Sequence, residues 1–213
     1  MNVGSLLARH ARYRENDVAV VCGAHRFTFA EHYARVNRLA NVLRTFGLRK
    51  GDALAIILPN CIELLEAYRA CAQLGVVSVP LSPLLRGPGL VSLLRDSDSA
   101  AVLACRSMIE ALNEARRELN HIAPNNYILT DAPGTPGYQD YAALTAAMTA
   151  DPPPVPDIQD HDIYNVIYSS GTTGHPKGIV HTHYVRALYG TMFASQFRFT
   201  PESVVMHAGS LVF

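Results

Sequence analysis

The sequence predicts an α/β fold in which helices flank a doubly wound, mostly parallel sheet. Three observations lead to this prediction. Apolar runs and amphipathic segments alternate four times between residues 53 and 131, which is typical of βαβ crossovers. The runs are continuously apolar, which indicates strands that are covered on both faces. The loops between them are short, as expected for consecutive crossovers in one sheet.

The first fifty residues predict a strand and a long helix ahead of this repeat. Residues 18–22 form a short apolar run that favours a strand. Thr28 and Glu31 match a capping box, in which the hydroxyl accepts from a helical N–H and the carboxylate reaches back. Gly47 supplies a left-handed residue that ends the helix. The apolar stripe of this helix consists of Tyr33, Val36, Leu39, Ala40, Leu43 and Phe46.

The repeat itself predicts four strands separated by helices. Pro59 ends the first strand, and Asn60 is expected to cap the following helix, which Gly75 ends. Pro88 opens the next helix, because proline fits the first helical turn. The expected strands cover residues 53–58, 76–81, 100–104 and 127–130, and later helices cover residues 108–119 and 138–149.

The last part of the chain begins with a proline-rich segment, residues 151–157, which favours an extended linker. A strand is expected at residues 164–168, a helix capped by Thr182, and another strand at residues 204–206. We therefore expect one incomplete α/β domain over residues 1–213. Its parts are a lead-in segment (1–50), βα repeats (51–150), a linker (151–160) and a final segment (161–213) that carries the loop described below.

The composition excludes several classes of protein. The chain has 18 basic and 18 acidic residues and no net charge, which argues against a nucleic-acid binder. Hydrophobic residues make up 49% of the chain, so it is not a disordered protein. No apolar run approaches the length of a membrane span. The four cysteines form no Cys-x-x-Cys pair, so we expect reduced, buried thiols and a cytoplasmic location.

Several other polar residues have ordinary interpretations. His181 and His183 lie two residues apart, but no third ligand has a matching spacing, and zinc sites need three or four ligands. No metal site is therefore expected. The remaining carboxylate pairs, interpreted as charges on helix surfaces and at helix ends, are Glu63 with Glu66 and Asp96 with Asp98.

Residues 169–178, Ser-Ser-Gly-Thr-Thr-Gly-His-Pro-Lys-Gly, carry the strongest functional signal. Glycines let backbone N–H groups approach a polyphosphate, hydroxyls donate to its oxygens, and a lysine neutralises charge. The spacing is not that of a Walker A loop, because Pro176 replaces its glycine and Gly178 follows Lys177. The pattern predicts a strand–loop–strand flap over phosphates. An ordinary hydroxyl-rich hairpin loop is the alternative.

Residues 168–178 resemble the AMP-binding signature of the adenylate-forming superfamily. This family includes acyl-CoA synthetases, adenylation domains of peptide synthetases and luciferases. Further segments resemble other motifs of the same family, so the resemblance covers nearly the whole chain. These segments are residues 27–31, 47–60, 75–83 and 178–183.

The resemblance implies an ATP-dependent ligase that activates a carboxylic acid. In this family the carboxylate attacks the α-phosphate of magnesium-bound ATP, pyrophosphate leaves, and the acyl group passes to the thiol of coenzyme A. His183 is a weaker candidate for the substrate pocket, and no catalytic residue is implied, because the family's adenylation lysine lies outside this chain. The implied phosphate-binding residues are Ser169, Ser170, Gly171, Thr172, Thr173, Gly174 and Lys177.

Members of this family are much longer than this chain, so the resemblance implies an N-terminal portion. The family's segments for adenine, ribose and the adenylation lysine have no match here. We expect such a portion to be inactive alone and to self-associate through apolar surface at residues 1–50 and 180–213. The identity of the acid stays open. The alternatives are an adenylation domain of a peptide synthetase and a truncated nucleotide-binding module without catalysis.

Overall fold

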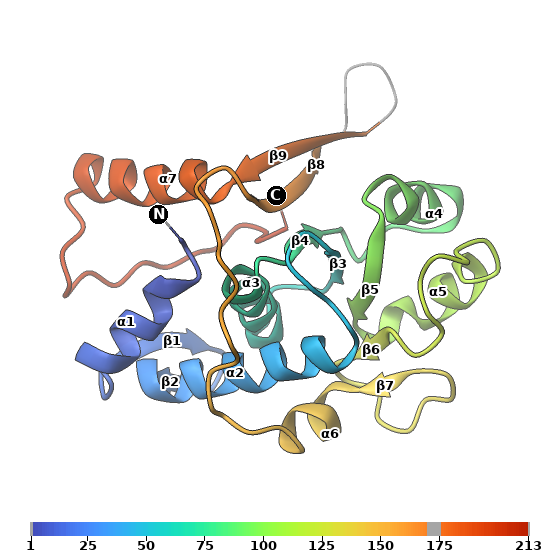
Figure 1. The fold of residues 1–213 in the computed structure, drawn as a ribbon, viewed down its shortest axis with the longest axis horizontal. Helices are drawn as coiled ribbons and strands as arrows, with labels where there is room; N and C mark the ends of the chain where they lie inside the picture. Colours follow the sequence, from blue (N-terminus) through green and yellow to red (C-terminus); the bar gives the residue numbers. More distant parts are fainter. Residues whose placement is uncertain (1, 170–175, 213) are drawn as a thin grey trace.

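The computed structural model describes residues 2–169 and 176–212, which form one seven-stranded sheet flanked by helices (Figure 1). Its strands are β3 (Ala53–Ile57), β4 (Val77–Pro80), β5 (Ser99–Ala104), β6 (Tyr127–Leu129), β7 (Gln139–Asp140), β8 (Ile163–Ser169) and β9 (Lys177–Thr182). Their order across the sheet is β7-β6-β5-β3-β4-β8-β9. Neighbouring strands are parallel, except that β9 runs antiparallel to β8. The predicted fold class is confirmed.

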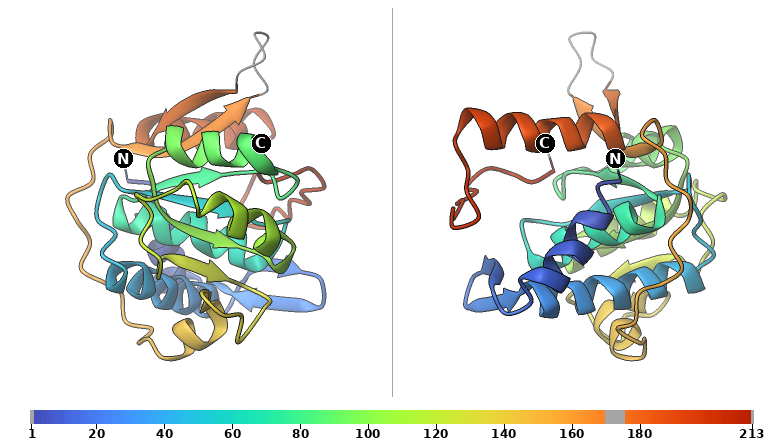
Figure 2. Two further views of the ribbon diagram at one scale, coloured as in Figure 1. Left: turned by 90° about the vertical axis from the view of Figure 1, so that its right-hand side faces the viewer. Right: turned by 60° about the vertical axis from the view of Figure 1, so that its left-hand side comes forward.

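Helices cover both faces of this sheet. The helices of the described residues are α1 (Ser5–Tyr13), α2 (Phe29–Thr45), α3 (Ile62–Leu74), α4 (Gly87–Asp96), α5 (Ile109–Ala115), α6 (Tyr141–Ala146) and α7 (His183–Gln196). The step from β3 through α3 to β4 and the step from β4 through α4 to β5 cross the sheet in opposite directions. Since such crossovers are right-handed, α3 and α4 lie on opposite faces. The left view of Figure 2 shows α4 and α5 on one side of the strands and α2 and α3 on the other.

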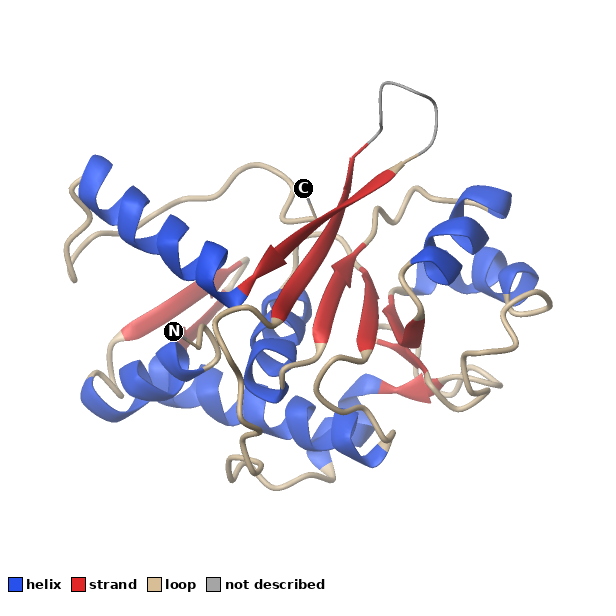
Figure 3. Cartoon of the chain, turned by 45° about the horizontal axis from the view of Figure 1, so that its top comes forward, coloured by secondary structure: helices blue, strands red, loops and turns tan. Residues whose placement is uncertain are grey.

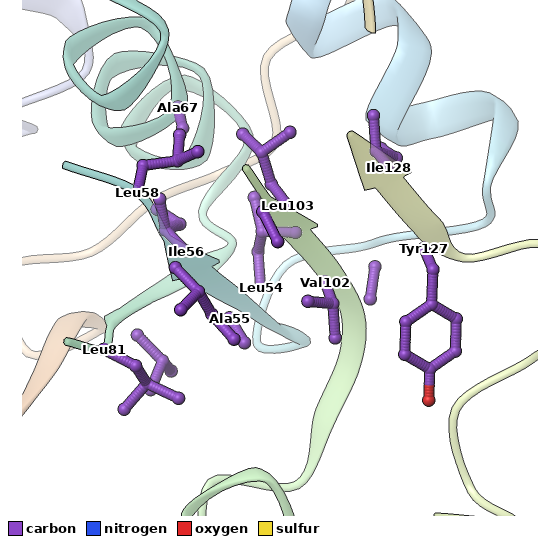
Figure 4. Close-up of a cluster of buried hydrophobic side chains, with 14 of the residues drawn as sticks. Leu54, Ala55, Ile56, Leu58, Ala67, Leu81, Val102, Leu103, Tyr127 and Ile128 are labelled. Carbon is purple, nitrogen blue, oxygen red and sulfur yellow. The ribbon is translucent and has the colours of Figure 1, made fainter. Parts of the chain in front are cut away.

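The core lies between these layers and is centred on β3. All five residues of β3 are buried, as expected for a strand covered on both faces. Figure 4 shows Leu54 and Ile56 of β3 packed in one cluster with side chains from β5 and β6, such as Leu103 and Ile128. Continuous apolarity in the sequence therefore marks the central strands.

Two peripheral elements complete the fold. A separate antiparallel ribbon joins β1 (Val18–Cys22) to β2 (His25–Thr28), outside the main sheet. The proline-rich linker runs back along the molecule and is held by polar side chains of α2 and of the loop that follows it. Asn41 on α2 donates to the carbonyls of Thr149 and Asp151, and Lys50 donates to the carbonyl of Asp157.

The predicted helix ends agree well with the structure. Thr28 and Glu31 form both hydrogen bonds of the capping box at the start of α2. Gly75 ends α3 with a φ of 68°, which is the left-handed conformation that glycine adopts without strain. Thr182 accepts a hydrogen bond from the backbone N–H of Val185 at the start of α7. All four cysteines are free thiols, but only Cys71 and Cys105 are buried as predicted, whereas Cys22 and Cys61 are half-buried.

Asn60 does not cap α3 as predicted, because Cys61 holds the N-cap position. The Asn60 amide instead bridges to a distant segment. Its Nδ2 donates to the carbonyl of Gly209, and its Oδ1 accepts from the N–H of Leu211. An asparagine uses the same side-chain amide whether it caps a helix or hydrogen-bonds to a distant segment. The local sequence therefore could not distinguish these two roles for Asn60.

Three predicted element boundaries are also wrong. The helix expected at residues 108–119 is a 3-10 turn (Arg106–Met108) followed by the shorter α5. The helix expected at residues 138–149 begins later, at α6, since Asp140 ends β7 and accepts from the N–H of Ala142. The strand expected at residues 204–206 does not form, and these apolar side chains are exposed without a partner strand.

Glu66 is not a helix-surface charge as predicted, because it is completely buried. The Nε–H of Arg35 on α2 donates to one oxygen of this carboxylate, and the Tyr141 hydroxyl on α6 donates to the other. Burial raises the pKa of Glu66, while these two partners act in the opposite direction. Residues from two other helices therefore decide the environment of Glu66, and these contacts are not visible in the helical pattern.

Within residues 2–169 and 176–212, no helix is both long enough and apolar enough to cross a bilayer.

Candidate functional site

The predicted phosphate loop connects β8 to β9, at the carboxyl ends of the parallel strands (Figure 3). Ser169 pairs with Lys177 and Tyr168 pairs with Gly178 across this antiparallel pair of strands. The two predicted flanking strands are therefore present, as β8 and β9. The expected phosphate-binding residues Ser170, Gly171, Thr172, Thr173 and Gly174 lie outside the described residues. Ser169 and Lys177 are described, and they frame the loop from opposite strands.

Gly178 allows the two strands to pack closely at the base of the loop. A Cβ atom at this position would lie 2.9 Å from Cγ1 of Val166 and 3.3 Å from Cε1 of Tyr168. The first distance is shorter than a carbon–carbon contact permits. A side chain at residue 178 would therefore require the Val166 or Tyr168 side chain to move, which favours glycine at this position.

Tyr168 links the base of the loop to helix α4. Its hydroxyl donates to Oδ2 of Asp96, which is the last residue of α4. Burial, followed by the Asp96 carboxylate, raises the pKa of Tyr168, so the phenol stays protonated and keeps donating. Asp96 was expected to be a simple helix-end charge. The sequence separates Asp96 from Tyr168 by 72 positions, so only the fold brings them together.

The two described loop residues lie at the surface, where a ligand can reach them. Ser169 and Lys177 are both exposed, and no described residue pairs with the Lys177 ammonium. Ser169 and Pro176 also line an apolar cavity of about 270 Å³, whose deeper walls include Leu81 and Leu93. This arrangement offers a cation and a hydroxyl for phosphate oxygens beside a pocket for an apolar group.

His183 does not lie beside this loop. It follows the far end of β9, and six strand residues at about 3.3 Å each place it roughly 20 Å from Lys177. The ring is completely buried, its Nδ1 accepts from the N–H of Val3, and it packs edge-on against Tyr164. Burial lowers the pKa of His183, so the ring stays neutral. Its observed contacts are those of a core residue that holds the N-terminal segment.

His181 on β9 contacts the neighbouring strand β8. Its Nδ1 lies 3.0 Å from Oδ1 of Asn165, a buried residue on β8, within hydrogen-bonding distance. Burial, and then the charge of Arg186, lower the pKa of His181. His181 and Asn165 thus form a polar contact inside the hairpin.

The described residues provide no protein cage for a metal ion. No group of three or more histidine, cysteine, aspartate or glutamate side chains comes together in residues 2–169 and 176–212. Magnesium in nucleotide enzymes is bound mainly through substrate phosphates and one or two carboxylates. We therefore assign no magnesium ligand among the described residues.

Comparison with known proteins agrees with the fold and the loop. The model of the family described as AMP-binding enzyme matches residues 7–213. The long-chain-fatty-acid–CoA ligase FadD13 of Mycobacterium tuberculosis is 35% identical over 162 residues, which cover 74% of this chain and 30% of that protein. The crotonobetaine/carnitine–CoA ligase of Salmonella typhimurium is 29% identical over 184 residues, which cover 84% and 35%.

The fold is also that of a solved ligase. The crystal structure of the anthranilate CoA ligase AuaEII, in complex with anthranoyl-AMP, matches with a TM-score of 0.85 and 23% identity. The match covers 91% of this chain and 37% of that one. The chain spans about a third of the length of the curated relatives it matches. Because the family model covers nearly all of its residues, the chain belongs to the AMP-binding enzyme family.

Proposed function

We propose that this chain is the ATP-phosphate-binding portion of an enzyme that activates a carboxylic acid with ATP and transfers it to coenzyme A. The observation that carries the proposal is the pairing of Ser169 with Lys177 at the mouth of the β8–β9 hairpin. The lysine is exposed there and has no described partner, so its charge is available to a polyphosphate. The names of the relatives, which are CoA ligases, support the same reaction class.

The proposed chemistry has two steps. A carboxylate oxygen attacks the α-phosphorus of ATP, the bond to the β-phosphate bridging oxygen breaks, and pyrophosphate leaves. The thiolate of coenzyme A then attacks the acyl carbonyl, and AMP leaves. In this scheme Lys177 and the hydroxyls of the loop, including Ser169, Thr172 and Thr173, hold the β- and γ-phosphates. Their contribution is positioning and charge neutralisation on the leaving pyrophosphate.

Magnesium, if bound with ATP, would neutralise phosphate charge in addition to Lys177. Its protein ligands are not among the residues assigned here, so no step depends on it. The apolar cavity beside Ser169 supports binding of an uncharged group next to the phosphates. His183 has no role in the proposal, since it lies at the other end of β9.

Calorimetric titration of ATP into the chain tests the proposal. Lys177→Ala is expected to weaken ATP binding about tenfold, because one charge-assisted contact to phosphate is lost. Lys177→Arg keeps the charge and should retain most of the affinity. Arg44→Ala, which removes an exposed cation elsewhere on α2, is the matched control and should change nothing. Absence of ATP binding, or equal affinity in the Lys177→Ala variant, contradicts the proposal.

We also propose that the chain alone binds ATP without turnover. The family's segments for ribose and for the adenylation lysine have no match in residues 1–213, so the chain has no complete set of groups for adenylation. The measurement is exchange of labelled pyrophosphate into ATP in the presence of a mixture of carboxylic acids. Exchange above the buffer background refutes this part of the proposal. It also separates a binding module from a complete ligase.

Self-association through helix α7 is the last part of the proposal. Large apolar side chains are exposed on this helix and on the segment after it. They include Leu188, Met192, Phe193, Phe197, Val204 and Met206. Exposed apolar side chains on one helix and the segment after it favour contact between copies of the chain.

Light scattering over a range of concentrations measures this association. The Phe193→Glu variant should lower the average mass, whereas Leu84→Glu, at an exposed leucine on another surface, should not. A constant monomer mass at every concentration contradicts self-association.

A further inference from the structure

A polar cavity of about 280 Å³ is lined by residues of α2, α3 and α6. Figure 1 shows these three helices on the other side of the molecule from the end of the β8–β9 hairpin. Each of the three helices contributes two polar side chains to its wall, spaced three or four residues apart. At this spacing both side chains of a pair lie on the same helix face. The pairs are Arg35 and Arg38, Glu63 and Glu66, and Tyr141 and Thr145.

The inner wall of the cavity is already neutralised. The buried Glu66 carboxylate accepts from Arg35 through one oxygen and from Tyr141 through the other. A buried carboxylate with both oxygens engaged is held in a fixed position and has little capacity for a further ligand. We therefore assign these three side chains to the rigid inner wall of the cavity and look for ligand-binding groups on the outer wall.

The outer wall carries two opposite charges that do not pair. Arg38 is exposed on α2, and Glu63 is half-buried on α3. Among the described residues, no ion pair within 4.0 Å includes either side chain. A cation and an anion thus line the same cavity from two helices without forming an ion pair with each other.

We propose that this cavity binds a small zwitterion, such as a short amino acid. The carboxylate of the ligand would pair with Arg38, and its ammonium would pair with Glu63. Glu63 has the Cys61 thiol and Arg35 as neighbours but forms no ion pair within 4.0 Å in the part of the chain that the structure describes. A simple anion would lie beside the Glu63 carboxylate, and a simple cation beside Arg38, so a ligand with both charges fits best. The Thr145 hydroxyl already donates to the Tyr141 carbonyl, which leaves its oxygen free to accept from the ammonium.

This cavity is separate from the phosphate loop. Thr130, which lines it, directly follows β6, whereas the loop follows β8. The strands between them are β5, β3 and β4. Four strand spacings of about 4.8 Å place the two sites roughly 19 Å apart. The site therefore goes beyond the proposed ATP-dependent function, and its binding can be measured without ATP.

Calorimetric titration of the chain at neutral pH tests the proposal. The probes are glycine, β-alanine and 4-aminobutyrate, which separate the two charges by increasing lengths. At least one of them should bind in the millimolar range, and propionate and propylamine should each bind about tenfold more weakly, since each makes one of the two charge contacts. Arg38→Gln and Glu63→Gln should each weaken the zwitterion by a similar factor.

The matched control is Arg44→Gln, which removes an exposed arginine from the same helix outside the cavity and should leave binding unchanged. Thermal melts of the three variants establish that all of them fold. Three outcomes overturn the proposal: no binding by any of the three zwitterions, propionate binding as tightly as the best zwitterion, or no loss of affinity in Arg38→Gln.

Discussion

Helices α3 and α7 have comparable apolar content but opposite surroundings. Nine of the thirteen residues of α3 are buried, including Leu64, Ala67 and Cys71. Only His183 is buried among the fourteen residues of α7. Figure 3 shows α7 extending beyond the end of β9, away from the sheet. Apolar residues in a helix therefore indicate that the helix can pack against another element. The topology of the chain decides whether such an element lies beside it.

A matched pair of leucines gives the largest test of this comparison. Leu64 on α3 is completely buried, whereas Leu188 on α7 is 41% exposed. Leu64→Ala should lower the free energy of unfolding by about 3 kcal/mol, because it leaves a cavity in the core. Leu188→Ala should change it by about 0.5 kcal/mol or less. Urea unfolding of both variants measures the two values, and equal losses would mean that α7 is packed in solution.

Two histidines extend the comparison to pH. His32 on α2 is buried, and burial, followed by the charges of Arg69 and Arg35, lowers its pKa to about 4. In the unfolded chain this histidine binds its proton near pH 6.5. The contribution of neutral, buried His32 to the free energy of unfolding is therefore fully present above that pH and is lost as the pH falls towards 4. The loss attributable to His32 is about 3 kcal/mol at the lower end.

The measurement is denaturant unfolding at pH 7.5 and at pH 4.5. The His32→Gln variant should show a clearly flatter pH dependence than the original chain. His181→Gln is the control from the hairpin region. The pKa of His181 is lowered as well, but its ring is only half-buried, so its removal should flatten the dependence less. A larger effect at His181 would reverse the comparison.

The smallest expected effects on stability come from replacing two glycines by alanine. One replacement should destabilise the chain and the other should stabilise it. Gly178→Ala places a Cβ against Val166 and Tyr168 and should cost about 1 kcal/mol of stability. Gly190 lies inside α7 with nothing within 4 Å of its position for a Cβ. Gly190→Ala should therefore stabilise by roughly 0.5 to 1 kcal/mol, because alanine favours the helix. Thermal unfolding measures both, and a destabilising Gly190→Ala would indicate a hidden partner for α7.

Local patterns in the sequence predict the βα core well. Residues 53–58 are continuously apolar and form the central strand, and the Thr28 capping box and Gly75 mark helix ends that the structure confirms. The exceptions are residues whose role depends on distant partners. Asn60 bridges to Gly209 and Leu211 instead of capping its own helix. The apolar run at residues 204–206 is typical of a strand, but no neighbouring strand pairs with it.

The candidate site is predictable to the same extent. The loop composition identifies Ser169 and Lys177, and the structure brings these two together at the mouth of the hairpin. The contact between Tyr168 and Asp96 and the burial of Glu66 were not predicted. Each depends on packing between elements that are far apart in the sequence. The periodicity of a single helix contains no information on such packing.

The attachment of β8 to the sheet has a consequence for how the molecule opens. Strands β3 and β4 share four register pairs, whereas β4 and β8 share one, Ser78 with Asn165, reinforced by the bond from the Ser78 hydroxyl to the Tyr164 carbonyl. We therefore predict that β8, β9 and α7 open as one unit before the centre of the sheet, once the contacts of Tyr168 with Asp96 and of His183 with Val3 are released. Amide hydrogen exchange should detect it as a group of protons that exchange together, and before those of β3 and β5.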